Sequence, residues 1–155
     1  MAKKEGIRKL FDIAQTMEDV ISLGVGEPDF VTPEHIRDAA KASMDAGKTA
    51  YTANYGLIEL RQEISKYLEN RFEVSYDPKD EILVTIGGSE AIDIALRALI
   101  EPGDEVLVPD PAYVSYAPLA AIEHAVVKPL VTKAENSFKL MPEELKAAIT
   151  EKTKV

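Results

Sequence analysis

The fold of this chain is decided by the stretch Glu81-Ile82-Leu83-Val84-Thr85-Ile86-Gly87-Gly88-Ser89-Glu90-Ala91. The mostly apolar run at 82–86 predicts a strand, and it leads directly into a pair of glycines. Apolar residues then recur at helical spacing on one stripe, which predicts a helix over about residues 89–100. The stretch therefore predicts a strand, a tight glycine turn and a helix in immediate succession.

The glycine turn is a candidate anion-binding site. Glycines allow backbone conformations that other residues avoid, and they let backbone N–H groups approach a ligand closely. The first N–H groups of a helix have no partner within the helix, and the helix dipole is positive there. Phosphate commonly binds at such a junction, where the Ser89 hydroxyl can bind the anion or cap the helix. A plain strand-to-helix turn is the alternative interpretation.

Composition fits one ordinary globular domain and argues against several classes of protein. The chain has 155 residues, of which 46% are hydrophobic, and this is enough for a sizeable core. A net charge of -9 argues against nucleic-acid binding, which needs clustered Lys and Arg. The absence of cysteine excludes disulfides and thiolate metal sites. No apolar run suggests a membrane span or a secretory signal, so the cytoplasm is the expected location.

Strands and helices alternate along the second half of the chain. Helices are predicted at residues 7–17, 33–46, 57–72, 89–100 and 113–124 and from 142 onward. Strands are predicted at 82–86, 105–108 and 125–131, with the approach to a fourth at 152–155. This alternation predicts a three-layer α/β/α fold with a mainly parallel sheet. Ligands in such sheets bind beyond the carboxyl ends of the strands, so the glycine turn and the loop at 110–113 can face one site.

Four segments together resemble the class I (fold-type I) aminotransferases, which use pyridoxal 5′-phosphate. They are residues 21–34, 51–61, 87–91 and 102–116, and they follow the family's order and spacing. The resemblance implies that residues 51–155 form the first, incomplete part of the large cofactor-binding domain of an aspartate/aromatic aminotransferase-like protein. Residues 1–50 would then form an N-terminal arm and a segment that belongs with the small domain.

The resemblance also implies a reaction, the transfer of an amino group from an amino acid to a 2-oxo acid by a homodimer. In this family, the lysine that forms a Schiff base with the cofactor lies downstream of the matched region. The aspartate that pairs with the pyridine nitrogen and the arginine that grips the substrate carboxylate lie downstream too. We therefore expect no catalytic residue in this chain and no activity from it alone. A lyase or synthase of the same fold, or a non-enzymatic α/β interaction module, are the alternatives.

By resemblance, Gly88, Ser89 and Glu90 lie where the family binds the cofactor phosphate. Backbone N–H groups and the Ser89 hydroxyl would make most of these contacts. A carboxylate beside a phosphate is repulsive, so we expect only the N–H of Glu90 to matter, with its side chain turned away. The alternative role for Glu90 is a favourable negative charge at the start of a helix.

Three further positions take roles from the resemblance. Tyr113 would stack on the cofactor ring, for which a flat aromatic face is suited, although core packing is the alternative. Tyr51 would reach the partner subunit's phosphate across the dimer interface, or it is a half-buried loop residue. Gly26 would contact the substrate carboxylate region through its backbone, or it serves a tight turn. The two histidines, His35 and His124, lie far apart on predicted helices, so we expect no metal site.

Overall fold

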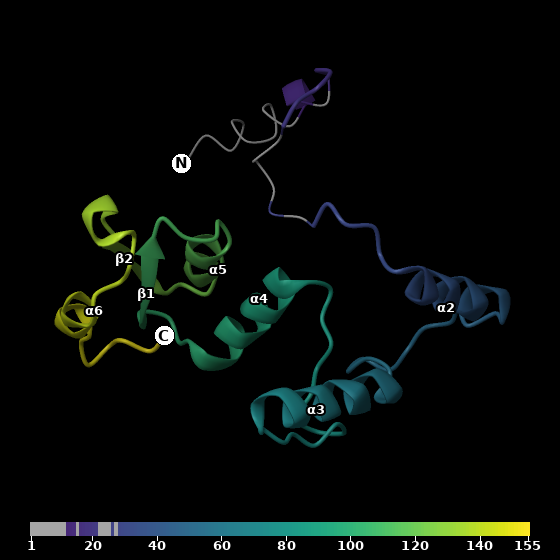
Figure 1. Cartoon of the computed structure of the whole chain (residues 1–155). Coiled ribbons are helices and arrows are strands. Elements are labelled where there is room, and N and C mark those ends of the chain that lie inside the picture. The colour runs from purple at the N-terminus through teal and green to yellow at the C-terminus, as the bar shows by residue number, and fades with distance from the viewer. Residues whose placement is uncertain (1–11, 15, 22–25, 27) are drawn as a thin grey trace. The chain divides into compact units, whose positions relative to one another are not determined.

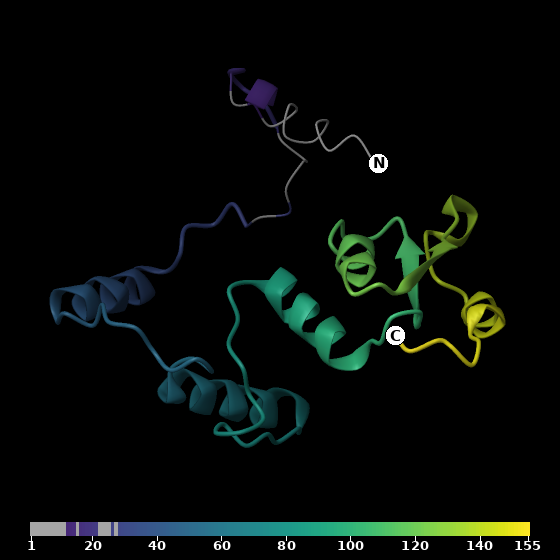
Figure 2. The same cartoon turned by 180° about the vertical axis from the view of Figure 1, so that it is seen from behind.

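The structure is a computed structural model that describes residues 12–14, 16–21, 26 and 28–155. The chain divides into two compact units, Met1–Tyr51 and Thr52–Val155, and each is described by itself. Figure 1 shows the elements in chain order, and Figure 2 shows the same chain from behind. In the part of the chain that the structure describes, no helix is long and apolar enough to cross a membrane.

The first unit contributes the helix α2 (Glu34–Asp45). It begins after Pro33 and ends just before Gly47, as the sequence predicts, because proline suits the start of a helix and glycine its end. Gly47 has a φ of +71°, which favours glycine. The predicted helix at 7–17 falls largely outside the described residues, of which only 12–14 are helical in that range.

In the second unit, α3 (Ile58–Phe72) is held to the loop that follows it by one buried arginine. Arg61 is only 7% exposed, and its Nη1 donates to the carbonyl oxygens of Pro78 at 2.7 Å and Lys79 at 2.9 Å. Its guanidinium also lies 5.8 Å from the centre of the Tyr55 ring. A single side chain therefore joins the loop before α3 to the loop after it.

The predicted strand at 82–86 is wrong for this structure. The segment has no regular secondary structure, and it pairs with no strand among the described residues. It is held instead by the loop before α3, where the Val84 N–H donates to the Tyr55 oxygen at 3.1 Å. Gly56, with a φ of +91°, packs so closely there that a Cβ would lie 2.8 Å from the Val84 Cβ. A β-strand needs a neighbouring strand with which to form hydrogen bonds, and local sequence preference cannot supply that partner.

Two parallel strands form the sheet, β1 (Glu105–Asp110) and β2 (Val126–Val131), as predicted. Their register pairs Glu105 with Val126 and Asp110 with Val131. The end of the chain also approaches β1 as predicted. Thr153 forms a parallel bridge with Glu105, and the Leu107 N–H donates to the Val155 oxygen at 2.9 Å.

Helices flank this strand pair and confirm the α/β class. The helices α4 (Gly88–Leu99), α5 (Tyr116–Ile122) and α6 (Pro142–Ala148) follow the predicted order, with a short 3₁₀ turn, η1 (Ala134–Asn136), between β2 and α6. In both views α5 and α6 lie on opposite sides of the strand pair (Figures 1 and 2). The buried core joins α4 and α5 to β1 through Leu96, Ile100, Val106, Val108 and Ala120.

An apolar groove remains open between α4 and β1. It has a volume of about 460 Å³, and Leu96, Val106, Tyr116 and Val155 are among the residues that line it. Several large apolar side chains of this unit are also exposed, including Ile86 at 92%. The second unit therefore buries only part of the apolar surface that its elements present.

Candidate functional site

The structure brings Ser89 and Tyr113 together, although they are 24 residues apart in the sequence. Ser89 lies in the first turn of α4, and Tyr113 lies in the loop that follows β1. Their hydroxyl oxygens are 2.8 Å apart, which is a hydrogen bond. The glycine turn and the loop after β1 therefore meet at the carboxyl end of the strand, where ligands bind in parallel α/β sheets.

Backbone donors gather at the start of α4. Gly87, with a φ of +82°, precedes the helix, and the first N–H to find an acceptor is that of Ala91, which donates to the Gly87 oxygen at 3.4 Å. Among the described residues, nothing accepts a hydrogen bond from the N–H groups of Gly88, Ser89 or Glu90. These three donors lie at the positive end of the helix dipole, so the turn presents unused hydrogen-bonding capacity suited to an anion.

The side chain of Glu90 is used inside this turn. Its Oε2 accepts a hydrogen bond from the N–H of Ile86, and Thr85 Oγ1 donates to the Gly87 oxygen at 3.0 Å. A negative charge in the first turn of a helix is favourable. The carboxylate is thereby tied to the residues before the helix, while the N–H of Glu90 has no acceptor within the described chain.

Tyr113 is half exposed, at 51%, and does not belong to the core. It lies in a turn before α5, because that helix begins at Tyr116 and not at residue 113 as predicted. The Tyr116 ring meets it edge to face, with centroids 5.6 Å apart and planes at 78°. The Ser115 hydroxyl and, to a smaller extent, the Ser89 hydroxyl lower the pKa of Tyr113, because both stabilise the phenolate by hydrogen bonding.

The other two predicted site residues, Tyr51 and Gly26, lie in the first unit. Tyr51 is fully exposed, so it is not the half-buried loop residue of the alternative interpretation. Gly26 is also exposed, and a Cβ at that position would have nothing within 4 Å. Its neighbours Val25 and Glu27 lie outside the described residues.

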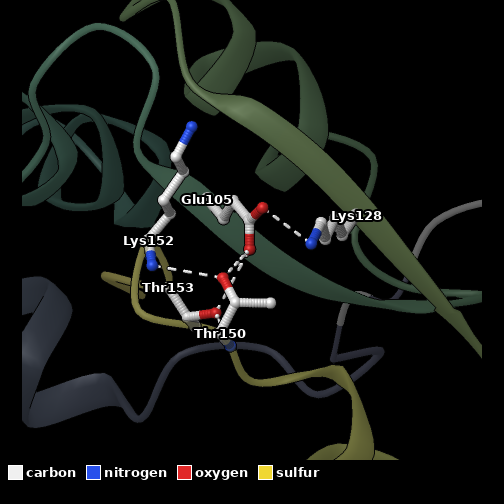
Figure 3. A network of polar contacts seen from close by, with 5 residues as sticks. All are labelled: Glu105, Lys128, Thr150, Lys152 and Thr153. Atoms are coloured by element: carbon white, nitrogen blue, oxygen red, sulfur yellow. Dashed lines mark hydrogen bonds and ion pairs between the residues drawn. The ribbon is translucent and has the colours of Figure 1, made fainter.

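A second polar cluster, which the sequence analysis missed, lies at the amino-terminal ends of the strands (Figure 3). Glu105, at the start of β1, is 8% exposed. Its Oε1 lies 2.7 Å from Lys128 Nζ, and its Oε2 accepts from Thr150 Oγ1 at 2.6 Å and from Thr153 Oγ1 at 3.4 Å. Hydrogen bonding from Lys128 and then from Thr150 lowers the pKa of this carboxyl group. A charged residue at the start of an apolar strand was the available signal.

This second cluster is closed, and it has no feature of a binding site. Thr150 Oγ1 also accepts from the Lys152 N–H at 3.1 Å, and the Thr150 N–H donates to Thr153 Oγ1 at 2.8 Å. Each oxygen of the Glu105 carboxylate thus already has a partner. No group of three or more potential metal-ligating side chains was found among the residues described.

The residues of the glycine turn fit a phosphorylated cofactor with a flat ring. Three unused N–H groups and the Ser89 hydroxyl suit a phosphate group, and the half-exposed Tyr113 ring stands beside them. The site presents hydrogen-bond donors and an aromatic ring, which suit the binding and orientation of a ligand.

Comparison with known proteins identifies the family. The family described as aminotransferase class I and II matches residues 18–155. The chain is 52% identical over 98% of its length to the Bacillus subtilis protein YugH, which is assigned to the aminotransferases. It is 49% identical over 96% of its length to an aspartate aminotransferase of Pyrococcus abyssi. The crystal structure of an aromatic aminotransferase from Pyrococcus horikoshii superimposes with a TM-score of 0.81 over 95% of this chain and 39% of that one, at 41% identity.

The lengths of these relatives show what share of each one this sequence covers. The chain spans 39% of the Bacillus subtilis relative and 38% of the Pyrococcus abyssi one, or about two fifths of the length of the curated relatives it matches. The expected family and its α/β fold are thereby confirmed. This chain belongs to the class I and II aminotransferase family.

Proposed function

We propose that this chain is the first part of a pyridoxal 5′-phosphate-dependent aminotransferase that moves an amino group from an amino acid to a 2-oxo acid. One observation carries the proposal: the unused N–H groups of Gly88, Ser89 and Glu90 stand beside the paired hydroxyls of Ser89 and Tyr113. This cluster fits a phosphate next to an aromatic ring, and it occurs in a chain that belongs to an aminotransferase family.

In this proposal, the chain's own residues bind and orient the cofactor. The three N–H groups and the Ser89 hydroxyl hold the phosphate, and the Tyr113 ring lies against the pyridine ring. When bound, the cofactor supplies an aldehyde and an electron-accepting ring, which is chemistry that amino-acid side chains lack. Residues 51–155 belong to the large cofactor-binding domain, and residues 1–50 to an N-terminal arm and the small domain.

The remaining predicted roles need a second subunit or the substrate. Tyr51 contacts the phosphate bound by the partner subunit of a homodimer, and its full exposure leaves its side chain available for such a contact. Gly26 contacts the substrate carboxylate region through its backbone, and the open space around it admits a ligand. The complete protein acts in amino-acid metabolism in the cytoplasm.

The test is a half-reaction with the complete enzyme that contains this sequence. Bound cofactor is mixed with single amino acids, and its absorbance is followed. We expect at least one common amino acid to convert the bound aldehyde form into the amine form and to release the matching 2-oxo acid. If no common amino acid does so, the transaminase assignment is wrong. Release of other products from an enzyme that binds the cofactor would identify a lyase or synthase instead.

A further inference from the structure

We propose that the Tyr113 hydroxyl positions the Ser89 hydroxyl, so that the site for a phosphate monoester at the start of α4 is assembled before the ligand binds. This inference rests on the proposed function and adds a second role for Tyr113, through its oxygen and not its ring face. Tyr113 would act through Ser89 and is therefore a positioning residue for the phosphate.

Two separate elements bring these oxygens to 2.8 Å. The backbone of Ser89 is fixed in the first turn of α4. Tyr113 is steadied by its edge-to-face contact with Tyr116. It follows Pro109, near the end of β1, and Pro111, in the loop after β1, and both prolines have restricted φ angles. Each hydroxyl is held by its own element, Ser89 by α4 and Tyr113 by the loop after β1. Their contact therefore follows from the way these two elements pack together.

The direction of the hydrogen bond between Ser89 and Tyr113 decides what their contact does for a bound anion. A hydroxyl has one proton to donate and lone pairs that accept, and either oxygen of this pair can be the donor. An anion at the helix start accepts hydrogen bonds only, so it requires the Ser89 proton. The Tyr113 hydroxyl then donates to Ser89, and Ser89 donates to the anion. Each bond in such a chain polarises the next, so the Ser89 hydroxyl becomes a better donor than it would be alone.

The other polar side chain of the turn does not compete for this role. The Glu90 carboxylate is engaged by the N–H of Ile86, before the helix. Within the described residues, the one side chain that hydrogen-bonds to the Ser89 hydroxyl is that of Tyr113. Removal of the Tyr113 hydroxyl therefore leaves the Ser89 hydroxyl free to rotate among several directions, of which one serves the phosphate.

The test measures ligand affinity in the complete apoenzyme with Tyr113→Phe, Ser89→Ala and the double variant. Pyridoxal 5′-phosphate and pyridoxal, which lacks the phosphate, are the two probes. We expect Tyr113→Phe to weaken binding of the phosphorylated probe by about three- to tenfold, the range for one neutral hydrogen bond, and to leave pyridoxal unchanged. In the Ser89→Ala background, Tyr113→Phe should have no further effect. Tyr116→Phe, which removes a neighbouring tyrosine hydroxyl, is the matched control and should leave both affinities unchanged.

Several outcomes would overturn the inference. If Tyr113→Phe weakened binding of both probes equally, the Tyr113 hydroxyl would act on the cofactor ring or on the stability of the fold, and not on the phosphate. If the losses of affinity in the two single variants simply added in the double variant, the Tyr113 hydroxyl would not act through Ser89. No loss at all would also refute it. If the unaltered protein bound pyridoxal and its phosphate equally, or neither, the proposed phosphate site and the proposed function would fail together.

A second measurement needs no cofactor. The Ser89 hydroxyl contributes to the lowered pKa of Tyr113, so Ser89→Ala should raise that pKa toward the ordinary value for tyrosine. The phenol titration is followed by NMR with labelled tyrosine, and Tyr113→Phe identifies the signal. An unchanged Tyr113 pKa in Ser89→Ala would mean that the two hydroxyls are not in contact in solution, and the inference would be wrong.

Discussion

The two ends of the strand pair differ in how their polar groups are used. At the amino-terminal ends of β1 and β2, both oxygens of the Glu105 carboxylate bond to neighbouring side chains. Beside the carboxyl end of β1, three N–H groups of the glycine turn have no acceptor in the described chain. Glu105 is 8% exposed, whereas Tyr113 is 51% exposed. We call the Glu105 cluster the closed end of the strand pair, and the glycine turn with Tyr113 the open end. The two ends use similar polar groups differently. Where polar groups satisfy one another away from water they hold the fold, and where they stay unpaired and accessible they can bind a ligand.

The largest expected effect is on transaminase turnover, and not on cofactor binding. The purified 155-residue chain, supplied with pyridoxal 5′-phosphate and amino acids, should show no transaminase turnover above that of the free cofactor. By the resemblance we expect the family's covalent lysine to lie downstream of the residues matched here, and Lys128 is already paired with Glu105. Amino-acid-dependent formation of a 2-oxo acid is the measurement, with the complete enzyme as positive control. Turnover by the chain alone would show that the open end is more than a binding surface.

The next prediction tests whether the open end binds through its hydroxyl. In the complete enzyme, Ser89→Ala should weaken cofactor binding by about 1.5–3 kcal/mol, because it removes one hydrogen bond to a charged group. Thermal stability should change little, since Ser89 makes no capping bond to α4. Equilibrium dialysis measures the affinity, and Ser75→Ala, at an exposed serine in the loop after α3, is the control. An unchanged affinity would reduce the open end to an ordinary helix start.

A backbone substitution tests how the segment before the open end is held. Gly56→Ala should destabilise the protein by about 1–3 kcal/mol, because the backbone is strained for alanine and a Cβ would lie 2.8 Å from the Val84 Cβ. Gly47→Ala is the matched control, since its φ is also positive but the space around it is open. Denaturant midpoints should fall further for Gly56→Ala than for Gly47→Ala. Equal changes would mean that the contact with Val84 does not restrain residues 82–86.

The smallest expected effect is a pH dependence at the closed end. The folded pKa of Glu105 lies below its ordinary value of 4.5, so its charged form stabilises the fold above that value, and this contribution is lost as the pH falls through the folded pKa. Glu105→Gln should therefore lower the melting temperature at neutral pH by on the order of a few degrees and reduce its fall in acid.

Glu63→Gln is the control for that pH effect. Glu63 is also 2.7 Å from a lysine, Lys66, but its side chain is 70% exposed. An exposed ion pair contributes little, so this substitution should leave the pH profile unchanged. If Glu105→Gln and Glu63→Gln gave the same profile, the closed end would be no different from the surface.

Local pattern predicted those parts of the molecule that depend on neighbours in sequence. The spacing of apolar residues placed α3, α4, β1 and β2 to within a few residues, because burial of one face requires that spacing. The glycine turn was also recognisable, since a positive φ at Gly87 favours glycine. Predictions made from the family's motifs named Ser89 and Tyr113 as site residues.

Distant contacts explain what the sequence did not predict. The segment 82–86 has the composition of a strand, but pairing requires a second strand, and composition does not provide it. The bond from Thr150 to Glu105 joins residues 45 apart. The Ser89–Tyr113 contact joins the first turn of α4 to the loop after β1, and their approach depends on the packing of α4 against β1. Serine, threonine and tyrosine are common on surfaces, so their presence alone does not indicate such contacts.

The parallel pairing of β1 and β2 also sets an order of events during synthesis. Glu105 and its partner in the register, Val126, are joined by a short connection through α5, so these strands can pair as soon as residue 131 has left the ribosome. The threonines that complete the Glu105 cluster, Thr150 and Thr153, are made later. We expect Lys128, on the adjacent strand, to supply the countercharge until then, so that the Glu105 carboxylate is not left unpaired in the nascent chain.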